Sequence, residues 1–564
     1  MQTQSLRAAP ASKSSRHALH QRLKNLLSLS GAVLLTLAVH SPAQAFCGFY
    51  AGKADANLFN EASQVVVVRD GKRTVISMLN DYKGPLSEFA LVVPTPTTLQ
   101  KGQVRVADKL TFERLDAYSS PRLAEYHDND PCQVQFNWGY DAYPMRKNGA
   151  LAMSAPASAA PRAMNEMMRD KALGVTVEAQ YTLEEYDIVS LSATQSDGLE
   201  TWLAQNGYKI PKGASAALRP YINQGMKFFV AKVNLKEQLK TGYTTLRPLQ
   251  FAFESDKFML PMRLGMLNAP PDKAQDLIVY LLTRDGRVES SNYRTAKLPA
   301  NVNLPHFVKP KFQDFYKALF DHEALKEQHR VVFTEYFWDM AWCDPCAANP
   351  LSPQELRNAG VFWTGSADSI AKGGGSGGGA QPVVLTRLHL RYTANTFPED
   401  LMFTQTKDRQ NWQTRYVVQN PYEGSVAQCS AKVGQMDCEA MCRPRVAQMV
   451  NAPQLEGQQN GPREGQRPLF RDRDPIALQR DCVSACVAAK QAGVDAAVRY
   501  YQTDLPRRIE AEKQTLARLT GWKMSEVDAL PGAMQFSGTE APRSTPQGVK
   551  PWWEDLFKTS WVTP

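Results

Sequence analysis

The fold class of this chain is decided by one stretch of its sequence, Val65-Val-Val-Val-Arg-Asp-Gly-Lys-Arg-Thr-Val-Ile-Ser-Met-Leu79. Residues 65–69 and 74–79 are short runs rich in β-branched side chains, which are typical of strands. Asp70-Gly71 lies between them, and this dipeptide favours the tight turn of a β-hairpin. We therefore predict two adjacent antiparallel strands at this point of the chain.

Strand-like runs continue along the sequence, with only occasional helical patterns between them. The predicted strands are 89–93, 174–180, 186–191, 226–233, 249–253, 277–282, 293–298, 331–338 and 383–392, and the predicted helices among them are 198–206 and 313–328. A further run, 412–419, is expected to pair with 383–392. Because the strands and helices lack regular βαβ spacing, the sequence predicts an α+β fold with mainly antiparallel sheet and short helices.

The formal net charge of +9 is concentrated at the start of the chain. Residues 1–45 carry five basic side chains and no acid, which leaves +4 on the rest and no long Lys/Arg run, so a nucleic-acid partner is not expected. The apolar run 26–39 is shorter than the ~20 residues of a membrane span. Together with the small residues Ala43 and Ala45, this pattern predicts a secretory signal cleaved near Ala45. The mature chain is then expected to have no transmembrane helix and to reside in the periplasm or on the cell surface.

Composition changes along the chain suggest its domain organisation. After the signal peptide, 1–45, we predict an α+β domain at 46–428, a Cys-rich helical hairpin region at 429–530 and a mostly disordered tail at 531–564. Within the first domain, 141–163 is rich in Ala, Pro, Ser and Met and is interpreted as a mobile insertion. The glycine run 373–379 is interpreted as a flexible tether.

The nine cysteines all follow the predicted signal, and in an exported chain they are expected to form disulfides. Cys438 and Cys442, like Cys482 and Cys486, are four residues apart and so share one face of a helix. Two such helices packed antiparallel bring together two nested pairs, Cys438–Cys486 and Cys442–Cys482. A four-thiolate zinc site is the alternative, and an oxidising compartment disfavours it.

Trp342-Cys-Asp-Pro-Cys346 is similar to the active-site motif of thioredoxins. A Cys-x-x-Cys pair at the start of a helix has a lowered thiol pKa and exchanges disulfides, with Cys343 here as the attacking thiol and Cys346 as the resolving one. However, Pro350 and Pro353 follow closely and would interrupt a long helix. A short structural disulfide is therefore preferred over a redox pair or half of a metal site.

The three other cysteines have no distinctive spacing. Pairing of Cys47 with Cys132 would fix the mature N-terminus, and Cys429 would then be the unpaired cysteine. Spacing alone does not determine such connectivity, so other pairings among the three remain open.

Several motifs along the chain resemble an uncharacterised bacterial family, domain of unknown function 2330. They begin at Cys47-Gly-Phe-Tyr, Ser63-Gln-Val-Val-Val-Val-Arg-Asp-Gly, Phe89-Ala-Leu-Val-Val-Pro-Thr-Pro, Glu185-Tyr-Asp-Ile-Val, Arg219-Pro-Tyr, Gly225-Met-Lys-Phe-Phe-Val, Cys343-Asp-Pro-Cys and Leu385-Thr-Arg-Leu-His-Leu. The resemblance spans roughly 47–425. It implies an exported bacterial protein and brings no catalytic residues with it.

The remaining polar residues suggest no catalytic site, metal site or cofactor. His389 alternates with Leu388 and Leu390, as a histidine on a sheet face does, and 127–130 is interpreted as a polar turn rather than a calcium loop. The acids at 184, 185 and 187 are expected to face solvent, and the methionines at 164, 167 and 168 to be exposed filler rather than copper ligands. The leading hypothesis is a non-catalytic exported protein that binds or organises an unidentified envelope component. The alternatives are thiol–disulfide exchange and metal binding.

Overall fold

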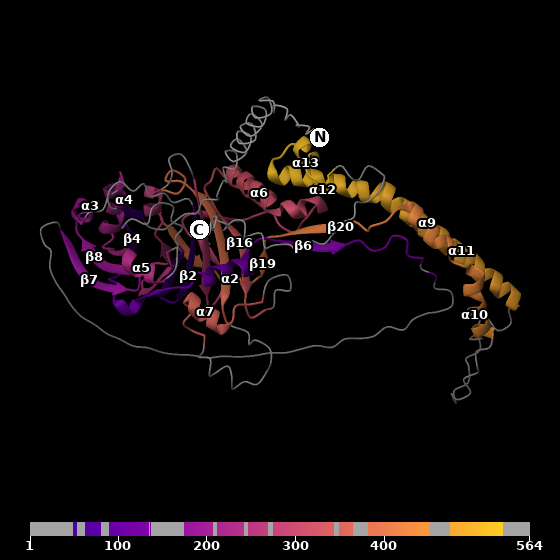
Figure 1. The fold of residues 1–564 in the computed structure, drawn as a ribbon, viewed down its shortest axis with the longest axis horizontal. Coiled ribbons are helices and arrows are strands. Elements are labelled where there is room, and N and C mark those ends of the chain that lie inside the picture. Colours follow the sequence, from indigo (N-terminus) through magenta and orange to yellow (C-terminus); the bar gives the residue numbers. More distant parts are fainter. Residues whose placement is uncertain are drawn as a thin grey trace, which may run out of the picture. The chain divides into compact units, whose positions relative to one another are not determined.

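The computed structural model describes residues 49–52, 62–79, 89–134, 136, 174–206, 211–241, 246–268, 274–342, 349–364, 382–450 and 474–533. All of them belong to one compact unit, Ala43–Val549. Figure 1 shows its sheets and helices along the chain. The predicted insertion 141–163, the tether 373–379 and most of the predicted tail lie outside the described residues.

The largest sheet has nine strands, and most neighbouring strands in it are antiparallel. Its order is β14 (Arg294–Lys297), β16 (Val331–Asp339), β17 (Val384–Tyr392), β12 (Gln275–Thr283), β2 (Ala62–Asp70), β3 (Arg73–Leu79), β10 (Leu249–Glu254) and β5 (Val104–Val106), with β19 (Trp412–Gln413) added beside β16. The predicted hairpin is present: β2 and β3 are antiparallel, and Gly71 in the turn between them has φ +59°.

Three smaller sheets complete the β structure. The five-stranded sheet runs β1 (Phe49–Gly52), β4 (Phe89–Thr95), β9 (Lys227–Val233), β8 (Tyr186–Ala193), β7 (Val175–Leu183), and it is wholly antiparallel. One three-stranded sheet runs β11 (Met259–Leu260), β18 (Leu401–Gln405), β13 (Val288–Ser290). The other is parallel and runs β15 (Val302–Leu304), β20 (Arg415–Asn420), β6 (Arg122–His127).

Helices connect and cover these sheets. They are α2 (Leu110–Ser119), α3 (Ser196–Gln205), α4 (Ala214–Asn223), α5 (Leu235–Thr241), α6 (Phe312–Lys326), α7 (Pro353–Ala359), α9 (Val426–Gly434), α10 (Cys438–Val450), α11 (Pro475–Arg499), α12 (Leu505–Thr520) and α13 (Met524–Asp528). A π-helical turn, Tyr500–Asp504, joins α11 to α12. None of the helices in these described ranges combines the length and the apolarity that a membrane span requires.

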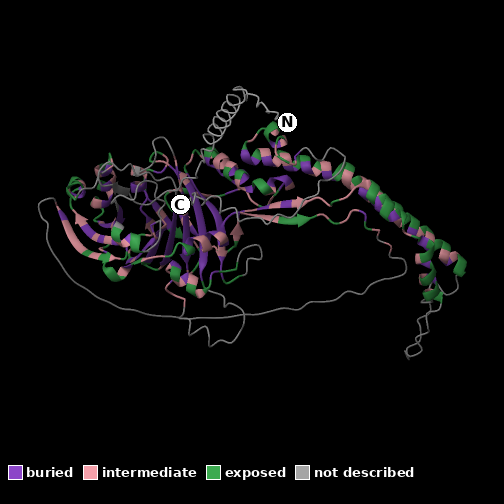
Figure 2. Cartoon of the chain, viewed as in Figure 1, coloured by how far each residue is buried: buried purple, intermediate pink, exposed green. Residues whose placement is uncertain are grey.

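The two larger sheets pack face to face, and helices cover their outer faces. The shared core between the sheets takes one face of β2, β3, β10, β12 and β17 and one face of β4, β8 and β9. Helices α3 and α4 cover the other face of the five-stranded sheet, and α2 and α7 cover the other face of the nine-stranded sheet. Because β2 is covered on both sides, all four valines of its Val65–Val68 run are buried, as Figure 2 shows for the central strands.

One predicted strand pairing is wrong. The run 412–419 does not pair with β17, whose two neighbours are β12 and β16. Instead the run divides into β19, which pairs antiparallel with β16, and β20, which enters the parallel sheet with β6 and β15. Both edges of β17 are already paired with other strands. Strand-like composition predicts that a run forms a strand, but it does not indicate which other strand the run pairs with.

The helical C-terminal part contains the predicted nested bridges. Cys438 is bonded to Cys486 and Cys442 to Cys482, with Cα–Cα distances of 5.7 and 5.9 Å. Beyond this hairpin, α12 returns to the rest of the protein, where its apolar face packs with α6 and strands β16 and β20 in one buried cluster. The division into domains at residue 428 stays a prediction, and the contacts of α12 cross it.

The predicted pairing of Cys47 with Cys132 is wrong, because Cys132 is bonded to Cys429 across 297 residues of sequence. The cause is the parallel pairing of β6 with β20, in which His127 lies opposite Asn420. Both strands leave this sheet in the same direction, so Cys132, in the turn after β6, meets Cys429 on α9. Cys47 lies outside the described residues.

Candidate functional site

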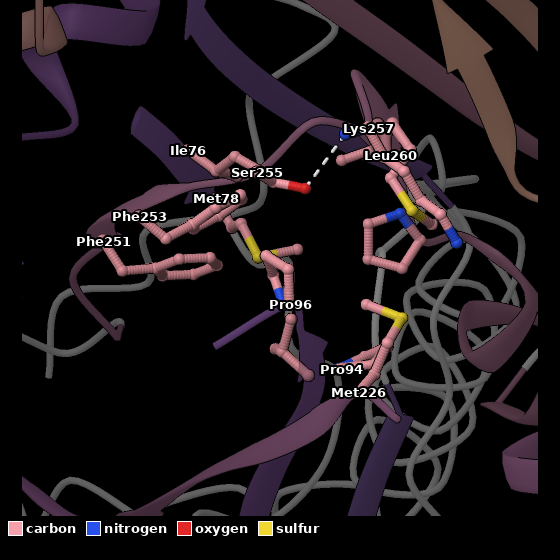
Figure 3. Close-up of a pocket in the computed structure, with 13 residues that line it drawn as sticks. Ile76, Met78, Pro94, Pro96, Met226, Phe251, Phe253, Ser255, Lys257 and Leu260 are labelled. Carbon is pink, nitrogen blue, oxygen red and sulfur yellow. Dashed lines mark hydrogen bonds between the residues drawn. The ribbon is translucent and has the colours of Figure 1, made fainter. Parts of the chain in front are cut away.

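An apolar cleft is lined by residues of β3 and β10 in the nine-stranded sheet and of β4 in the five-stranded sheet, and Figure 3 draws its side chains. Side chains fill most of it, and the space that remains has room for about one water molecule. The cleft is therefore narrow. Its lining comes from four separate parts of the chain: Ile76, Met78, Val93, Pro94, Pro96, Met226, Phe251, Phe253, Ser255, Lys257, Met259, Leu260 and Pro261.

The mouth of the cleft is shaped by a turn that follows β10. The buried Arg69 guanidinium donates to the backbone oxygens of Ser255 (3.0 Å) and Lys257 (3.1 Å). Within the turn, the Lys257 backbone N–H donates to Ser255 Oγ over 3.1 Å, the contact drawn in Figure 3. Arg69 also lies over the Phe258 ring, 5.0 Å from its centroid. These contacts fix the backbone from which the Lys257 side chain projects.

Lys257 is exposed and has a neutral partner. Its ammonium donates to Gln224 Oε1 over 2.7 Å, and no carboxylate of the described chain forms an ion pair with it. The neighbouring Asp256 is instead paired with Lys72 at 2.6 Å. The cleft therefore has apolar walls, Ser255 as a small polar group, and the positive charge of Lys257, which no acid among the described residues neutralises.

A second cluster of polar side chains is buried within the nine-stranded sheet. Arg387 on β17 is 2% exposed, and its Nε donates to Glu335 Oε2 over 2.5 Å. A terminal nitrogen of the same guanidinium donates to Asp116 on α2. Tyr280 on β12 donates to the same Asp116 oxygen over 3.0 Å. Two buried carboxylates thus share one buried guanidinium.

Glu335 owes its position to a β-bulge. The register between β16 and β17 shifts between Thr334 and Tyr336, so Glu335 is the extra residue on β16. A bulge redirects the side chain of the extra residue, and here the carboxylate meets Arg387, the hydroxyl of Tyr316 and His389 Nδ1, the last at 2.6 Å. Burial alone would raise the Glu335 pKa, but the positive charges of His389 and Arg387 outweigh it and hold the pKa well below its usual range.

His389 lies between two acids. Its Nε2 is 3.7 Å from Asp276 Oδ1, and its ring stacks on Phe320 with centroids 3.9 Å apart. Burial lowers the pKa of His389, but the negative charge of Glu335 and the Asp276 contact dominate and raise it. Asp276 is itself held by Arg391 through two contacts of 2.7 and 2.8 Å. The predicted sheet-face histidine is therefore part of a charge network, which we call the Arg387 network.

We expect this histidine to make stability depend on pH in one direction. Because folding raises the His389 pKa, its contribution is fully present below the unfolded value of about 6.5 and is lost as pH rises through the folded value. Replacing His389 by Gln should lower the urea midpoint at pH 6 more than at pH 9. Urea titrations of both proteins across this range measure the difference between their midpoints. A difference that grows with pH would contradict the raised pKa of His389.

The sequence did not reveal this network or a further buried acid. Glu185, expected to face solvent, is 1% exposed and pairs with Arg247 at 3.0 Å. The available signal was charge inside apolar strands, with Glu335 in β16 and the alternating Arg387 and His389 in β17. Matching these strands as neighbours would have brought the opposite charges together.

The sites predicted from the sequence have different outcomes. Cys343 and Cys346 lie outside the described residues, as do the methionines at 164, 167 and 168. The two acids of 127–130 form ion pairs with basic side chains of the helices. Asp128 accepts two hydrogen bonds of 2.8 Å from Arg508 on α12, and Asp130 pairs with Lys432 on α9 at 2.6 Å. Among the residues that the structure describes, no three His, Cys, Asp or Glu side chains form a group suited to a metal ion.

These features define a disulfide-containing α+β protein with two packed sheets, a narrow apolar cleft and a charge network inside one sheet. The chain belongs to the bacterial family described as "Uncharacterized protein conserved in bacteria", domain of unknown function 2330, which it matches over residues 41–404. This confirms the resemblance noted in the sequence. The match includes every residue that lines the cleft and the whole Arg387 network, and it ends before β20 and the C-terminal helices. No curated protein and no solved structure matches the chain.

Proposed function

We propose that this chain is an exported protein of the bacterial envelope whose role is to bind another molecule, in the periplasm or at the cell surface. The observation that carries the proposal is the set of three disulfides, Cys132–Cys429, Cys438–Cys486 and Cys442–Cys482. Disulfides persist in oxidising compartments and are rare in the cytosol. The signal-like residues 1–45 support the same location.

The binding role is supported by the cleft. Ligand sites are typically concave and mostly apolar, with a few placed polar groups. The cleft has this composition, and the charge of Lys257 at its mouth is not neutralised by a carboxylate of the described chain. The Arg387 network, by contrast, is buried among strands and helices and acts within the fold.

Mass spectrometry of the chain purified from the exported fraction tests the location. Free thiols are blocked first, and the protein is digested without reduction. We expect a mature N-terminus near Phe46 and peptides joined through the three bridges, whereas a variant lacking 1–45 should stay in the cytoplasm. A chain that retains residues 1–45 and has all six of these cysteines alkylated would contradict the proposal.

Thiol–disulfide exchange through Cys343 and Cys346 is the second candidate. The observation in its favour is that Trp342, the residue before Cys343, is 68% exposed at the end of β16. A Cys346→Ser variant should then accumulate mixed disulfides through Cys343. Metal binding remains a third hypothesis, which elemental analysis of the purified protein tests.

A further inference from the structure

We propose that Glu512 is a proton-dependent switch on α12: the helix packs firmly against its neighbours while this carboxyl is protonated and loosens when the carboxyl ionises. Two observations support the switch. Glu512 is buried in the packed face of α12, and the cation beside it is already bound to another acid. The switch is independent of the proposed location and of any ligand in the cleft.

Glu512 lies on the apolar face of α12. Its side chain is 5% exposed. Ile509 and Leu516, three and four residues away, share this face of the helix and belong to the buried cluster that includes Leu304 of β15 and Tyr416 of β20. The helix also contacts α6, α13 and the π-helical turn. An ionised carboxylate at such a position loses its hydration, which is costly unless a partner replaces it.

The cation beside Glu512 is Arg508, one turn earlier on α12, and it is already engaged. Its Nη1 and Nη2 donate to Asp128 Oδ1 and Oδ2, each over 2.8 Å. The remaining nitrogen, Nε, is 3.8 Å from Glu512 Oε1, which is too far for a hydrogen bond. Neither of these two buried atoms has a hydrogen-bond partner among the described residues. One guanidinium therefore lies between two acids, and Asp128 takes the hydrogen bonds.

The same contacts decide which of the two acids keeps a proton. Asp128 also accepts hydrogen bonds from the Tyr500 hydroxyl and, over 3.0 Å, from Gln419 Nε2. Burial raises the Asp128 pKa, but the bonds from Arg508 and Tyr500 outweigh it and hold the pKa below its usual value. Burial raises the pKa of Glu512 to about 7, where the positive charge of Arg508 opposes the rise and the negative charge of Asp128 adds to it. Glu512 is therefore the acid that exchanges its proton near neutral pH.

The other titratable groups around α12 give Glu512 no second ion-pair partner within the described ranges. Lys513 pairs with Asp528 of α13 at 2.8 Å, and β15 has no charged residue. His306, in the turn before α6, is buried, which lowers its pKa to about 4, so it is uncharged at neutral pH. His322 of α6 lies against the C-terminal end of α12. The ion pairs of that turn and of α6 include Lys309–Glu125, Lys311–Asp314, Lys317–Asp321 and Lys326–Glu323.

The switch acts in one direction. Because folding raises the pKa of Glu512 from about 4.5 to about 7, its contribution to the packing of α12 is fully present below pH 4.5. The contribution is lost as pH rises through 7 and changes little above that. Between these limits the loosened state holds one proton fewer, so opening of α12 should become up to about tenfold more frequent per pH unit.

Hydrogen exchange of the purified full chain, followed by mass spectrometry at pH 5.5, 6.5 and 7.5, tests the switch. Protection factors correct for the pH dependence of intrinsic exchange. In peptides that cover residues 506–519 they should fall at least about tenfold across this range. Glu512→Gln has the shape of the protonated acid and cannot ionise, so its protection should stay constant and should exceed that of the wild type at pH 7.5. A wild type without the fall, or a Gln variant that keeps it, would overturn the proposal.

Two further variants isolate the effect. Glu510→Gln, at an exposed position of the same helix, should behave as the wild type. Asp128→Asn removes a negative charge and frees Arg508 for Glu512, so the fall should move to lower pH, and a movement to higher pH would overturn the switch. Should that variant fail to fold, the comparison of Glu512→Gln with Glu510→Gln decides. An equal fall in peptides of α3 and α12 that Glu512→Gln leaves intact would assign the pH dependence to the whole fold and also overturn the switch.

Discussion

Replacing Arg387 by methionine is expected to lower the free energy of unfolding by roughly 3–5 kcal/mol, the range found when one partner of a buried ion pair is removed. Methionine fills similar space, so the loss comes mainly from charge. Both Glu335, fully buried, and Asp116, 2% exposed, would lose the guanidinium that neutralises them. Urea unfolding followed by tryptophan fluorescence and circular dichroism measures the change.

The matched control is Arg284→Met. Arg284 pairs with Asp70 at 2.6 Å near the end of the same sheet, but its side chain is 43% exposed, and exposed pairs contribute about 0–1 kcal/mol. Adding Glu335→Gln to Arg387→Met removes one of the two buried carboxylates that have lost the guanidinium and should recover part of the loss. A loss below about 1 kcal/mol for Arg387→Met, equal to that of Arg284→Met, would show that the network does not act as described.

Removing both nested bridges is expected to open the α10–α11 hairpin. Its buried cluster has six members, and four of them are the bridged cysteines themselves, with Val446 and Leu478 as the others. Each bridge closing a loop of this size is worth about 2–4 kcal/mol. Replacing all four cysteines by Ser should therefore lower the helix content and allow trypsin to cut at Arg445 and Arg480.

The control for this experiment is the third bridge. A variant with Cys132→Ser and Cys429→Ser keeps the nested pairs, so its hairpin should stay resistant at Arg445. The predicted difference lies in where cleavage occurs, which peptide mapping reports. Equal protection of the hairpin in both variants would mean that α10 and α11 pack without their bridges.

The strands and the nested bridges could be predicted because their signals are local: a run of β-branched residues, and two cysteines four residues apart. The β-branched run at Val65–Val68 predicts a strand wherever it is placed, and cysteines four residues apart share a helix face in any context. The Cys132–Cys429 bridge depends instead on β6 lying parallel to β20. No spacing within either segment encodes that pairing.

The cleft and the Arg387 network could not be predicted from the sequence, because their residues come from segments that lie far apart in the chain. The cleft takes its lining from positions 76 to 261, and no motif joins Met78 to Met226 or Lys257. Glu335 reaches Arg387 through a bulge, which adds one residue to the strand without altering its apolar composition. A charged side chain inside an apolar strand is a usable signal, but only once the neighbouring strand is known.

The parallel pairing of β6 with β20 has a consequence for the order in which the protein is built. Cys132 is synthesised 297 residues before Cys429, whereas the nested partners are only 48 and 40 residues apart. In the oxidising compartment proposed for this protein, a chain that enters with its N-terminus first would expose Cys132 before Cys429 is present. The native bridge therefore requires either that Cys132 waits as a thiol or that a wrong early bond is exchanged. In either case, the bridge that joins the segment after β6 to α9 cannot close before residue 429 has been made.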